Sequence, residues 1–313
     1  MKTAIFSCEA SLNIGTGHVI RCITLANFLE NKGWKCFFAT SNESYNFIKN
    51  LEKFTQIQPQ EFYKNPQNCD LLIVDNYNLD EKYESHFREF AQKILVIDDL
   101  ANRKHNCDIL LDQNIGSKVE DYENLVGKNC EILAGTKYCL LREEFLELRQ
   151  KALEKRSTTK NIANILVNFG GSDLKNHSLN ALQEIEKSKF SGEINVVLGF
   201  DAVNLKTIEE FAQKSKNKIT IHKQANMAKL IYDADIAFAA GGTSTWERCS
   251  LALPTYMVKI ADNQGKIFTK LGFNGNFEEF YYKVSANYQK FFNEIKDLVD
   301  AQGTQRIYSS IIN

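Results

Sequence analysis

Short runs of apolar residues, each about the length of one β-strand, recur along this chain with helix-sized segments between them. Continuous apolar runs are typical of strands in a parallel sheet that is buried on both faces, and strands that alternate with helices are typical of βαβ units. The pattern therefore predicts an α/β protein built on parallel sheets. The runs lie at 4–8, 36–39, 71–75, 94–99, 108–112, 163–169, 193–199, 219–221, 236–240 and 255–258.

A charged segment near the middle of the chain marks the expected domain boundary. Residues 147–160 have the pattern of a charged helix that runs into a polar stretch, and a new series of apolar runs follows. A chain of 313 residues is long for one hydrophobic core and ordinary for two. We expect two Rossmann-like domains, the first over residues 1–150 and the second over residues 151–313.

A glycine-bracketed turn, Gly15-Thr16-Gly17, follows the first predicted strand and ends at His18, where a helix is predicted to begin. A helix N-terminus offers unpaired N–H groups and a partial positive charge, at the edge of the sheet where ligands bind. This potential disfavours an imidazolium, so His18 is expected to be neutral near neutral pH and able to accept a proton. A histidine here can equally be a structural cap. The turn lacks the third small residue of the dinucleotide fingerprint, so we expect no nicotinamide or flavin cofactor.

A second glycine-rich turn, Gly241–Thr245, also lies between a predicted strand and a predicted helix. Its backbone can approach a ligand closely, which predicts a pyrophosphate cradle that needs neither lysine nor metal. The expected donors are the N–H groups of Gly242, Thr243 and Ser244. Glu247 can accept from a ribose diol, or it can be a solvated acid that complements the helix dipole. The related sequence Gly170-Gly171-Ser172-Asp173 is a candidate for the opposing wall.

Several predicted strands end in aspartate, at Asp75, at Asp98 and Asp99, and at Asp112. The carboxyl ends of parallel strands form the ligand-binding edge of the sheet, but aspartate is also a common helix cap there. Both interpretations stay open for each residue. Asp233-Ala234-Asp235 resembles a metal-binding D-x-D motif, but its place between a helix and a strand favours a turn or cap.

The composition excludes several classes of protein. With 38 basic and 39 acidic residues, the net charge of −1 gives no overall attraction to nucleic acid or anionic lipid. The eight cysteines are scattered without metal-ligand spacing, as is typical of a reducing cytosol. No signal-peptide pattern begins the chain, and no apolar run approaches the roughly 20 residues of a membrane span. We expect a cytoplasmic monomer that binds no metal, and the sequence holds neither a P-loop nor a G-x-S-x-G elbow.

The motifs also form an ordered set over about residues 3–273. The set comprises Ile14–His18 with Arg21, Leu72–Tyr77, Ile97–Leu100, Cys107–Asn114, Tyr138–Phe145, Gly170–Asp173, Gly241–Glu247 and Asp262–Gln264. It resembles the PseG family, the UDP-2,4-diacetamido-2,4,6-trideoxy-β-L-altropyranose hydrolases of pseudaminic acid biosynthesis. More distantly, it resembles the MurG glycosyltransferases. Each motif alone is common, but the order is specific.

The resemblance implies a GT-B fold, with two Rossmann-like domains that face each other across a cleft. It implies that UDP binds mainly to the second domain, that the sugar lies toward the first, and that His18 is the general base of a metal-independent hydrolysis with inversion. The tail from about Phe277 onward lies outside the match, and we expect it to form helices that pack on the core, with a crossing back to the first domain, as in GT-B tails, left open. The implied sugar-side residues are Gly15, Gly17, Arg21, Tyr77, Asp99, Arg142 and Asn263, and the implied UDP-side residues are Gly170, Gly171, Ser172, Gly242, Thr243, Ser244 and Glu247.

Two other functions stay open on the sequence. A GT-B glycosyltransferase would use the same turn and the same UDP cradle, with a sugar hydroxyl in place of water. A non-catalytic nucleotide-sugar sensor would bind UDP without turnover. The sugar nucleotide and the UDP product are the only partners that the motifs indicate. The resemblance implies that the pathway serves the modification of flagellin or of a surface glycan.

Overall fold

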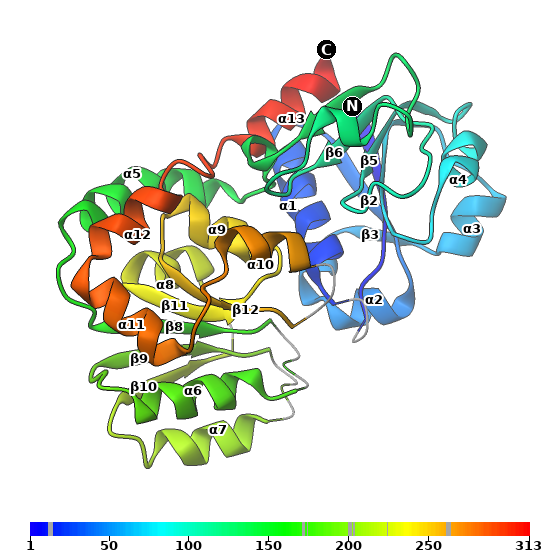
Figure 1. Cartoon of the computed structure of the whole chain (residues 1–313). Coiled ribbons are helices and arrows are strands. Elements are labelled where there is room, and N and C mark those ends of the chain that lie inside the picture. Colours follow the sequence, from blue (N-terminus) through cyan, green and yellow to red (C-terminus); the bar gives the residue numbers. More distant parts are fainter. Residues whose placement is uncertain are drawn as a thin grey trace. The chain divides into compact units, whose positions relative to one another are not determined.

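The computed structural model describes residues 1–11, 15–170, 173, 175–199, 202, 204–223, 225–260 and 264–313. The chain divides into two compact units. Unit 1 comprises residues 1–142 and 302–313, and unit 2 comprises residues 143–301. The sequence placed the boundary at residue 150 and assigned the tail to the second domain, with a return to the first left open. In the structure the charged helix lies entirely in unit 2, and the last helix joins unit 1 (Figure 1).

The elements of unit 1 follow one another in the order expected of βαβ units. They are β1 (Thr3–Cys8), α1 (Gly17–Asn31), β2 (Lys35–Ala39), α2 (Asn42–Phe47), η1 (Lys49–Leu51), β3 (Thr55–Ile57), α3 (Pro59–Lys64), β4 (Cys69–Asp75), α4 (Glu81–His86), β5 (Ala91–Ile97), β6 (Ile109–Asp112), η2 (Val119–Asp121), β7 (Glu131–Ala134), η3 (Thr136–Tyr138) and α13 (Gly303–Ile312).

Unit 2 repeats the same plan with fewer strands. Its elements are α5 (Glu143–Thr158), β8 (Asn164–Asn168), α6 (His177–Lys187), β9 (Glu193–Val197), α7 (Leu205–Ala212), β10 (Lys218–His222), α8 (Met227–Asp233), β11 (Ile236–Ala240), α9 (Ser244–Ser250), β12 (Thr255–Val258), α10 (Gly265–Leu271), α11 (Phe277–Ala286) and α12 (Tyr288–Ile295). Several helices begin at side-chain caps that accept a backbone N–H, as at Ser41, Asp80, Asn226, Asn276 and Asn287.

The sheet of unit 1 is parallel and has seven strands in the order β3-β2-β1-β4-β5-β6-β7. Successive side chains alternate between its faces. Phe6 and Ile73 pack with α1 and α13 in one cluster, whereas Ile5 and Leu72 pack with α3 and α4 in another. Because both faces are buried, these strands appear in the sequence as continuous apolar runs.

The sequence missed two strands of this sheet, β3 and β7. Residues 55–57 are only three in number and partly exposed, and residues 131–134 begin with an exposed glutamate. Both strands lie at the edges of the sheet, and neither carries a long apolar run. Short length and exposed residues therefore hid them from a search based on hydrophobicity, whereas β10 and β12, the edge strands of the other sheet, carry apolar runs that were found.

The sheet of unit 2 is also parallel and has five strands in the order β10-β9-β8-β11-β12. All five were predicted from their apolar runs. One face packs against α6, α7, α11 and α12, where an aromatic group around Phe238 and Phe277 fills the core. Helices α5, α8 and α9 contact one another, and Ala228 and Trp246 are buried among them.

Helix α13 docks on unit 1 by a close backbone approach. A Cβ atom on Gly303 would lie 2.3 Å from the carbonyl oxygen of Cys139 and 2.6 Å from its nitrogen. Thr304 bonds the backbone of Leu141 in both directions, and Phe28 meets Tyr308 edge to face. Glycine at position 303 is therefore what allows the end of the chain to reach this unit.

We expect Gly303→Ala to destabilise unit 1 by about 1–3 kcal/mol, because the new methyl group overlaps backbone atoms that cannot move cheaply. The matched control is Gly127→Ala, since a Cβ on Gly127 meets nothing within 4 Å. Urea unfolding of the two variants measures the difference. Equal stability for both would contradict the close docking of α13.

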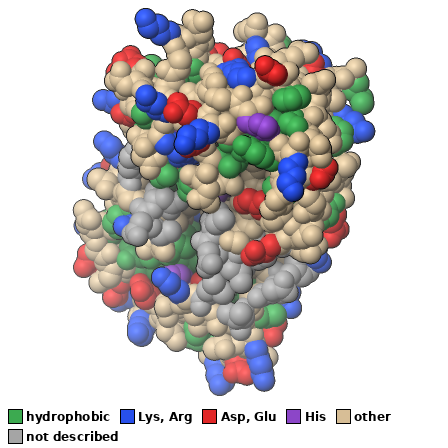
Figure 2. Space-filling model, turned by 90° about the vertical axis from the view of Figure 1, so that its right-hand side faces the viewer, with side chains coloured by type: hydrophobic (Ala, Val, Ile, Leu, Met, Phe, Trp, Pro, Cys, Tyr) green, Lys and Arg blue, Asp and Glu red, His purple; other side chains and the backbone are tan. Residues whose placement is uncertain are grey.

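Two further observations concern membrane-spanning helices and surface charge. No helix in the described ranges is long and apolar enough to cross a membrane. On the face shown in Figure 2, acidic and basic side chains are interspersed rather than gathered into patches of one sign.

Candidate functional site

The strand order of each sheet reverses at one point, and these two points are where open α/β sheets bind ligands. In unit 1 the reversal lies between β1 and β4, which pair directly, with Cys8 opposite Asp75. In unit 2 it lies between β8 and β11. The glycine turns found in the sequence follow β1, β8 and β11, so the fold brings them to these edges.

His18 and Asp75 meet at the reversal point of unit 1. His18 is the second residue of α1, and Asp75 ends the neighbouring strand β4. The Nδ1 atom of His18 lies 2.5 Å from Oδ1 of Asp75, and the carboxylate is fully buried. The histidine is itself only 7% exposed, so the protein surrounds most of its ring and only a small part can be reached at the carboxyl ends of the strands.

Arg21, one turn further along α1, clamps the same carboxylate. Its Nε lies 2.6 Å from Oδ2 of Asp75 and its Nη2 lies 2.6 Å from Oδ1, a bidentate pair. Burial raises the pKa of Asp75, but the charge of Arg21, the charge of His18 when that ring is protonated, and the hydrogen bonds of both residues outweigh burial and hold that pKa well below its usual range. Asp75 is therefore ionised.

The ionised carboxylate decides which tautomer of His18 is present. A carboxylate only accepts hydrogen bonds, so the proton between Asp75 and His18 belongs to Nδ1. In the neutral imidazole Nε2 then carries a lone pair. The ring can take a proton at Nε2 while Asp75 stabilises the charge that results, which is the arrangement of a general base with an orienting acid.

Tyr77 and Asp99 form the side wall of this cluster. The rings of His18 and Tyr77 meet edge to face with centroids 4.6 Å apart. The hydroxyl of Tyr77 lies 2.6 Å from Oδ1 of Asp99, and Arg21 Nη1 lies 3.4 Å from Oδ2 of the same residue. The structure thus brings together His18, Arg21, Tyr77 and Asp99, as four of the sequence-predicted residues.

The remaining predicted residues of unit 1 are placed as follows. Gly15 has φ +83°, a backbone conformation that is strained for any residue with a side chain. Its N–H donates a hydrogen bond to the carbonyl oxygen of Ser11. Gly17 begins α1. Arg142 ends unit 1 directly before α5, and its role stays a prediction. Asn263 lies outside the described residues, as do Gly171 and Ser172 of unit 2.

In unit 2, Gly170 and the loop after β11 lie at the ends of paired strands. Gly170 follows β8 with φ +88°, and Gly242 and Thr243 lead into Ser244, the first residue of α9. Gly242, Thr243, Ser244 and Glu247 are half-buried, so each can be reached from solvent. Their contact with a nucleotide stays a prediction.

Arg248 holds this loop in place through side-chain hydrogen bonds. Its side chain is 1% exposed, and it donates to the carbonyl of Ala240 at 2.7 Å, to Ser244 Oγ at 3.0 Å and to Thr245 Oγ1 at 3.1 Å. No ion pair joins it to a carboxylate of the described residues. Burial lowers its pKa to about 10, against smaller opposing effects of Cys249 and Glu247. A buried cation held only by hydrogen bonds to neutral groups is costly to keep in the folded protein.

Sequence reasoning missed the roles of Asp75 and Arg248. Asp75 was noted as a strand-end aspartate, but only the register of β1 with β4 places it against His18. Arg248 lay inside a predicted helix, and nothing in its spacing marked it as buried. Asp235 turned out to be structural, since its carboxylate accepts the N–H groups of Ala163 and Asn164.

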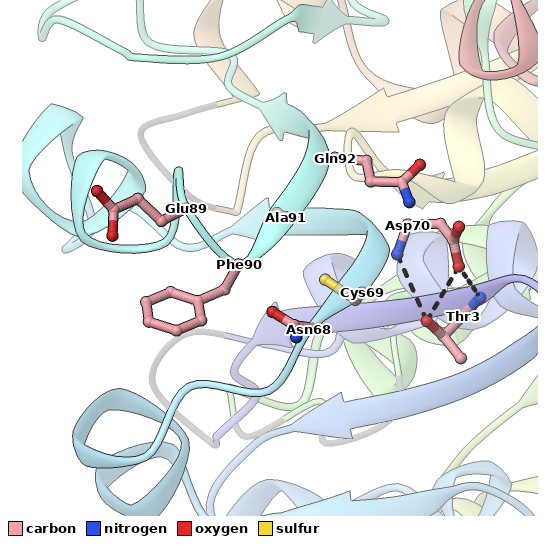
Figure 3. Close-up of a pocket in the computed structure, with 8 residues that line it drawn as sticks. All are labelled: Thr3, Asn68, Cys69, Asp70, Glu89, Phe90, Ala91 and Gln92. Carbon is pink, nitrogen blue, oxygen red and sulfur yellow. Dashed lines mark hydrogen bonds between the residues drawn. The ribbon is translucent and has the colours of Figure 1, made fainter.

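Two further features lie apart from this chemistry. No cluster of three or more His, Cys, Asp or Glu side chains with metal-binding geometry occurs in the part of the chain that the structure describes. A hollow of about 400 Å³ is lined by residues such as Asp70, Glu89 and Gln92 (Figure 3). It lies at the amino ends of β4 and β5, whereas His18 lies at the carboxyl ends of the strands. The carboxylate of Asp70 in this hollow accepts hydrogen bonds from the backbone N–H and the side-chain hydroxyl of Thr3.

Comparison with known sequences finds relatives along most of the chain. A UDP-2,4-diacetamido-2,4,6-trideoxy-beta-L-altropyranose hydrolase of Campylobacter jejuni is 28% identical over 89% of this chain and 99% of its own length. An uncharacterised protein of Methanocaldococcus jannaschii is 31% identical over 82% of this chain. A Helicobacter pylori protein, named a pseudaminic acid cytidylyltransferase and the same hydrolase, is 24% identical over 85%. The chain spans only about half of these last two, 55% and 46% of their lengths. No protein-family model matches the chain.

Solved structures share the fold at low sequence identity. MurG of Acinetobacter baumannii has a TM-score of 0.68 at 12% identity and matches 100% of this chain and 99% of its own. A UDP-GlcNAc 2-epimerase of Neisseria meningitidis, bound to UDP-GlcNAc, has a TM-score of 0.61 at 12% identity over the full length of both chains, 100% of each.

Two parallel sheets, each with its own reversal point, and these structural neighbours define a protein of the GT-B fold class. The expected fold class is thus confirmed. Within that class, the chain is similar to the Campylobacter hydrolase over nearly the full length of both proteins.

Proposed function

We propose that this chain hydrolyses UDP-2,4-diacetamido-2,4,6-trideoxy-β-L-altropyranose to UDP and the free sugar, a step of pseudaminic acid biosynthesis. The names of the Campylobacter and Helicobacter relatives support the substrate and the reaction. The single observation that carries the mechanism is the contact of His18 with the ionised Asp75 at the reversal point of unit 1. It supports a base aimed at the ligand-binding edge.

In the proposed step, a water molecule attacks the anomeric carbon from the face opposite UDP. The new C–O bond forms as the bond to the β-phosphate oxygen breaks, so the anomeric centre inverts. Nε2 of His18 removes one proton of the water, and Asp75 stabilises the imidazolium through Nδ1. Arg21 keeps Asp75 ionised and in place, and Tyr77 holds the ring edge to face.

We assign the nucleotide to unit 2. UDP is already a good leaving group, so the enzyme needs no general acid and no paired carboxylates of the polymer-glycosidase type. The N–H groups of Gly242, Thr243 and Ser244 would stabilise the charge that develops on the β-phosphate, and Glu247 would accept from the ribose diol. The buried cation of Arg248, which donates to Ser244 and to the carbonyl of Ala240 at this loop, supports a diphosphate there. On this proposal turnover needs no metal and persists in a chelator.

We expect Arg248→Met to weaken UDP binding about tenfold, or about 1.4 kcal/mol, because the loop loses its brace and the anion loses a nearby cation. The fold should tolerate the change, since a buried cation without a carboxylate is costly to keep. Arg156→Met is the matched control. Arg156 is also fully buried in unit 2, but it bonds the carbonyls of Ile231 and Ala234. Calorimetric titration with UDP separates the two variants, and equal losses would contradict a role for Arg248.

The hydrolase proposal is tested by offering UDP-2,4-diacetamido-trideoxyhexoses without any acceptor and following UDP and the sugar anomer by NMR. Fast release of UDP with an inverted product supports it. A glycosyltransferase, which the MurG-like fold also accommodates, would release UDP only slowly until an acceptor is added. A sensor would bind UDP and never turn over. We further propose that the protein acts as a cytoplasmic monomer, which size-exclusion chromatography and fractionation would check.

A further inference from the structure

Two thiols that are far apart in the sequence meet beside the first residues of β6 and β7. The Sγ atoms of Cys107 and Cys130 lie 3.6 Å apart. Cys107 is buried and Cys130 is half-buried, whereas the other cysteines of the chain are all buried. Cys130 is therefore the thiol that a small reagent in solvent reaches most easily.

The strand register makes this pair suitable for a disulfide. Ile109 of β6 pairs with Glu131 of β7, so the two cysteines lie two residues and one residue before that pair. An offset of about 3.3 Å along strands about 4.8 Å apart gives a Cα separation of about 6 Å. Disulfides have Cα separations of about 4.4–6.8 Å, so the bond can form with small side-chain rotations.

The environment also divides the chemical roles between the two sulfurs. The hydrogen bond to Cys130 and burial both raise the pKa of Cys107, so Cys107 keeps its proton. The hydrogen bond from Cys107 lowers the pKa of Cys130. Burial and the charge of Asp108 oppose this effect, and a backbone hydrogen bond from Leu110 and the charge of Arg88 add to it, so the net shift is downward. A half-exposed thiolate is the form of cysteine that reacts with peroxides.

We propose that Cys107 and Cys130 form a redox-sensitive pair, which a peroxide converts reversibly to a disulfide. The Cys130 thiolate attacks the peroxide, so an S–O bond forms, the O–O bond breaks, and the departing hydroxide takes a proton to become water. Cys107 loses its proton and attacks the Cys130 sulfur, so the S–S bond forms and the sulfenic oxygen leaves as water. Two thiols are oxidised by one hydrogen peroxide to one disulfide and two waters, and a dithiol reductant reverses the reaction.

This site is independent of the proposed hydrolysis. Cys107 and Cys130 lie just before the amino ends of β6 and β7, whereas Asp75 lies at the carboxyl end of β4 in the same parallel sheet. The disulfide would tie β6 to the edge strand β7 and close the chain segment between them. Because cross-linking restricts the unfolded chain, the oxidised protein should unfold at a higher temperature than the reduced one.

The test treats the full chain with hydrogen peroxide and maps its peptides by mass spectrometry without reduction. We expect one cross-linked peptide that joins Cys107 to Cys130, lost again on treatment with dithiothreitol. Cys107→Ser should instead accumulate a sulfenic acid on Cys130 that dimedone traps, and Cys130→Ser should yield neither product. Cys69→Ser, a change at a buried thiol of the same sheet, should cross-link as the natural protein does.

Further oxidation of Cys130 to the sulfinic acid without a cross-link would overturn the proposal, as would an unreactive Cys130 under conditions that oxidise free cysteine. Circular dichroism shows whether each variant folds. If Cys107→Ser does not fold, the peptide map of the natural protein and Cys130→Ser still decides the question.

Discussion

Replacing His18 by alanine should lower kcat for UDP release by about 10²–10⁴, because the water loses the base that takes its proton. UDP affinity should stay nearly unchanged, since the proposed UDP contacts are made by unit 2. NMR assays of UDP release measure kcat, and calorimetric titration with UDP measures the affinity. Substantial residual turnover in this variant would remove His18 from the role of general base.

The control for His18→Ala is His86→Ala. His86 is exposed on α4, where its ring stacks on Tyr63 and its Nε2 contacts the carbonyl of that residue. This change removes an imidazole from the same unit without touching the cluster at Asp75. We expect it to turn over at the natural rate, so that a loss specific to His18 reports on chemistry rather than on the loss of any histidine.

Replacing Asp75 by asparagine should have an effect of similar size. An asparagine can turn its N–H₂ group toward Nδ1 of His18, which then accepts, and the ring carries its proton on Nε2 instead. The base is then in the wrong tautomer, a change that costs about 10⁴ in kcat in the serine-protease triad. We expect a loss of about 10²–10⁴ in kcat with little change in UDP affinity.

Asp75→Asn should also alter stability and its dependence on pH. The change leaves Arg21 buried with a weaker partner, which we expect to cost about 3 kcal/mol at neutral pH. The low pKa of Asp75 in the folded state means that its stabilisation is present above the pKa of an unfolded aspartate, about 3.9. It is lost as the pH falls below that value, because the unfolded chain then binds the proton first.

The matched control is Asp70→Asn, on the same strand. Asp70 lies near the start of β4, where it accepts the N–H of Thr3 at 2.7 Å, whereas Asp75 ends that strand. Urea unfolding between pH 3 and pH 7 and turnover at pH 7 should separate the two variants. If Asp75→Asn keeps full kcat, or if its acid unfolding matches the natural protein, the proposed coupling of Asp75 to His18 is wrong.

The fold was largely predictable because burial on both faces of a parallel sheet leaves a direct trace in the sequence. Central strands such as β4 and β11 appear as continuous apolar runs, and all five strands of unit 2 were found in this way. The short edge strands β3 and β7 were not, because they bury too little to need such a run. The resemblance allowed the tail to cross back to the first domain, but only the tertiary structure shows that α13 is the part that does so, through the close approach at Gly303.

The candidate site divides in the same way. The sequence by itself determined that His18 starts a helix after a strand and a glycine turn, since those signals are local and physical. Only the tertiary structure decided that Asp75, Arg21 and Tyr77 surround it, that Arg248 is buried beneath the second glycine turn, and that Cys107 meets Cys130. The reason is that pairing between neighbouring strands, such as Cys8 with Asp75, joins residues that no spacing along the chain relates.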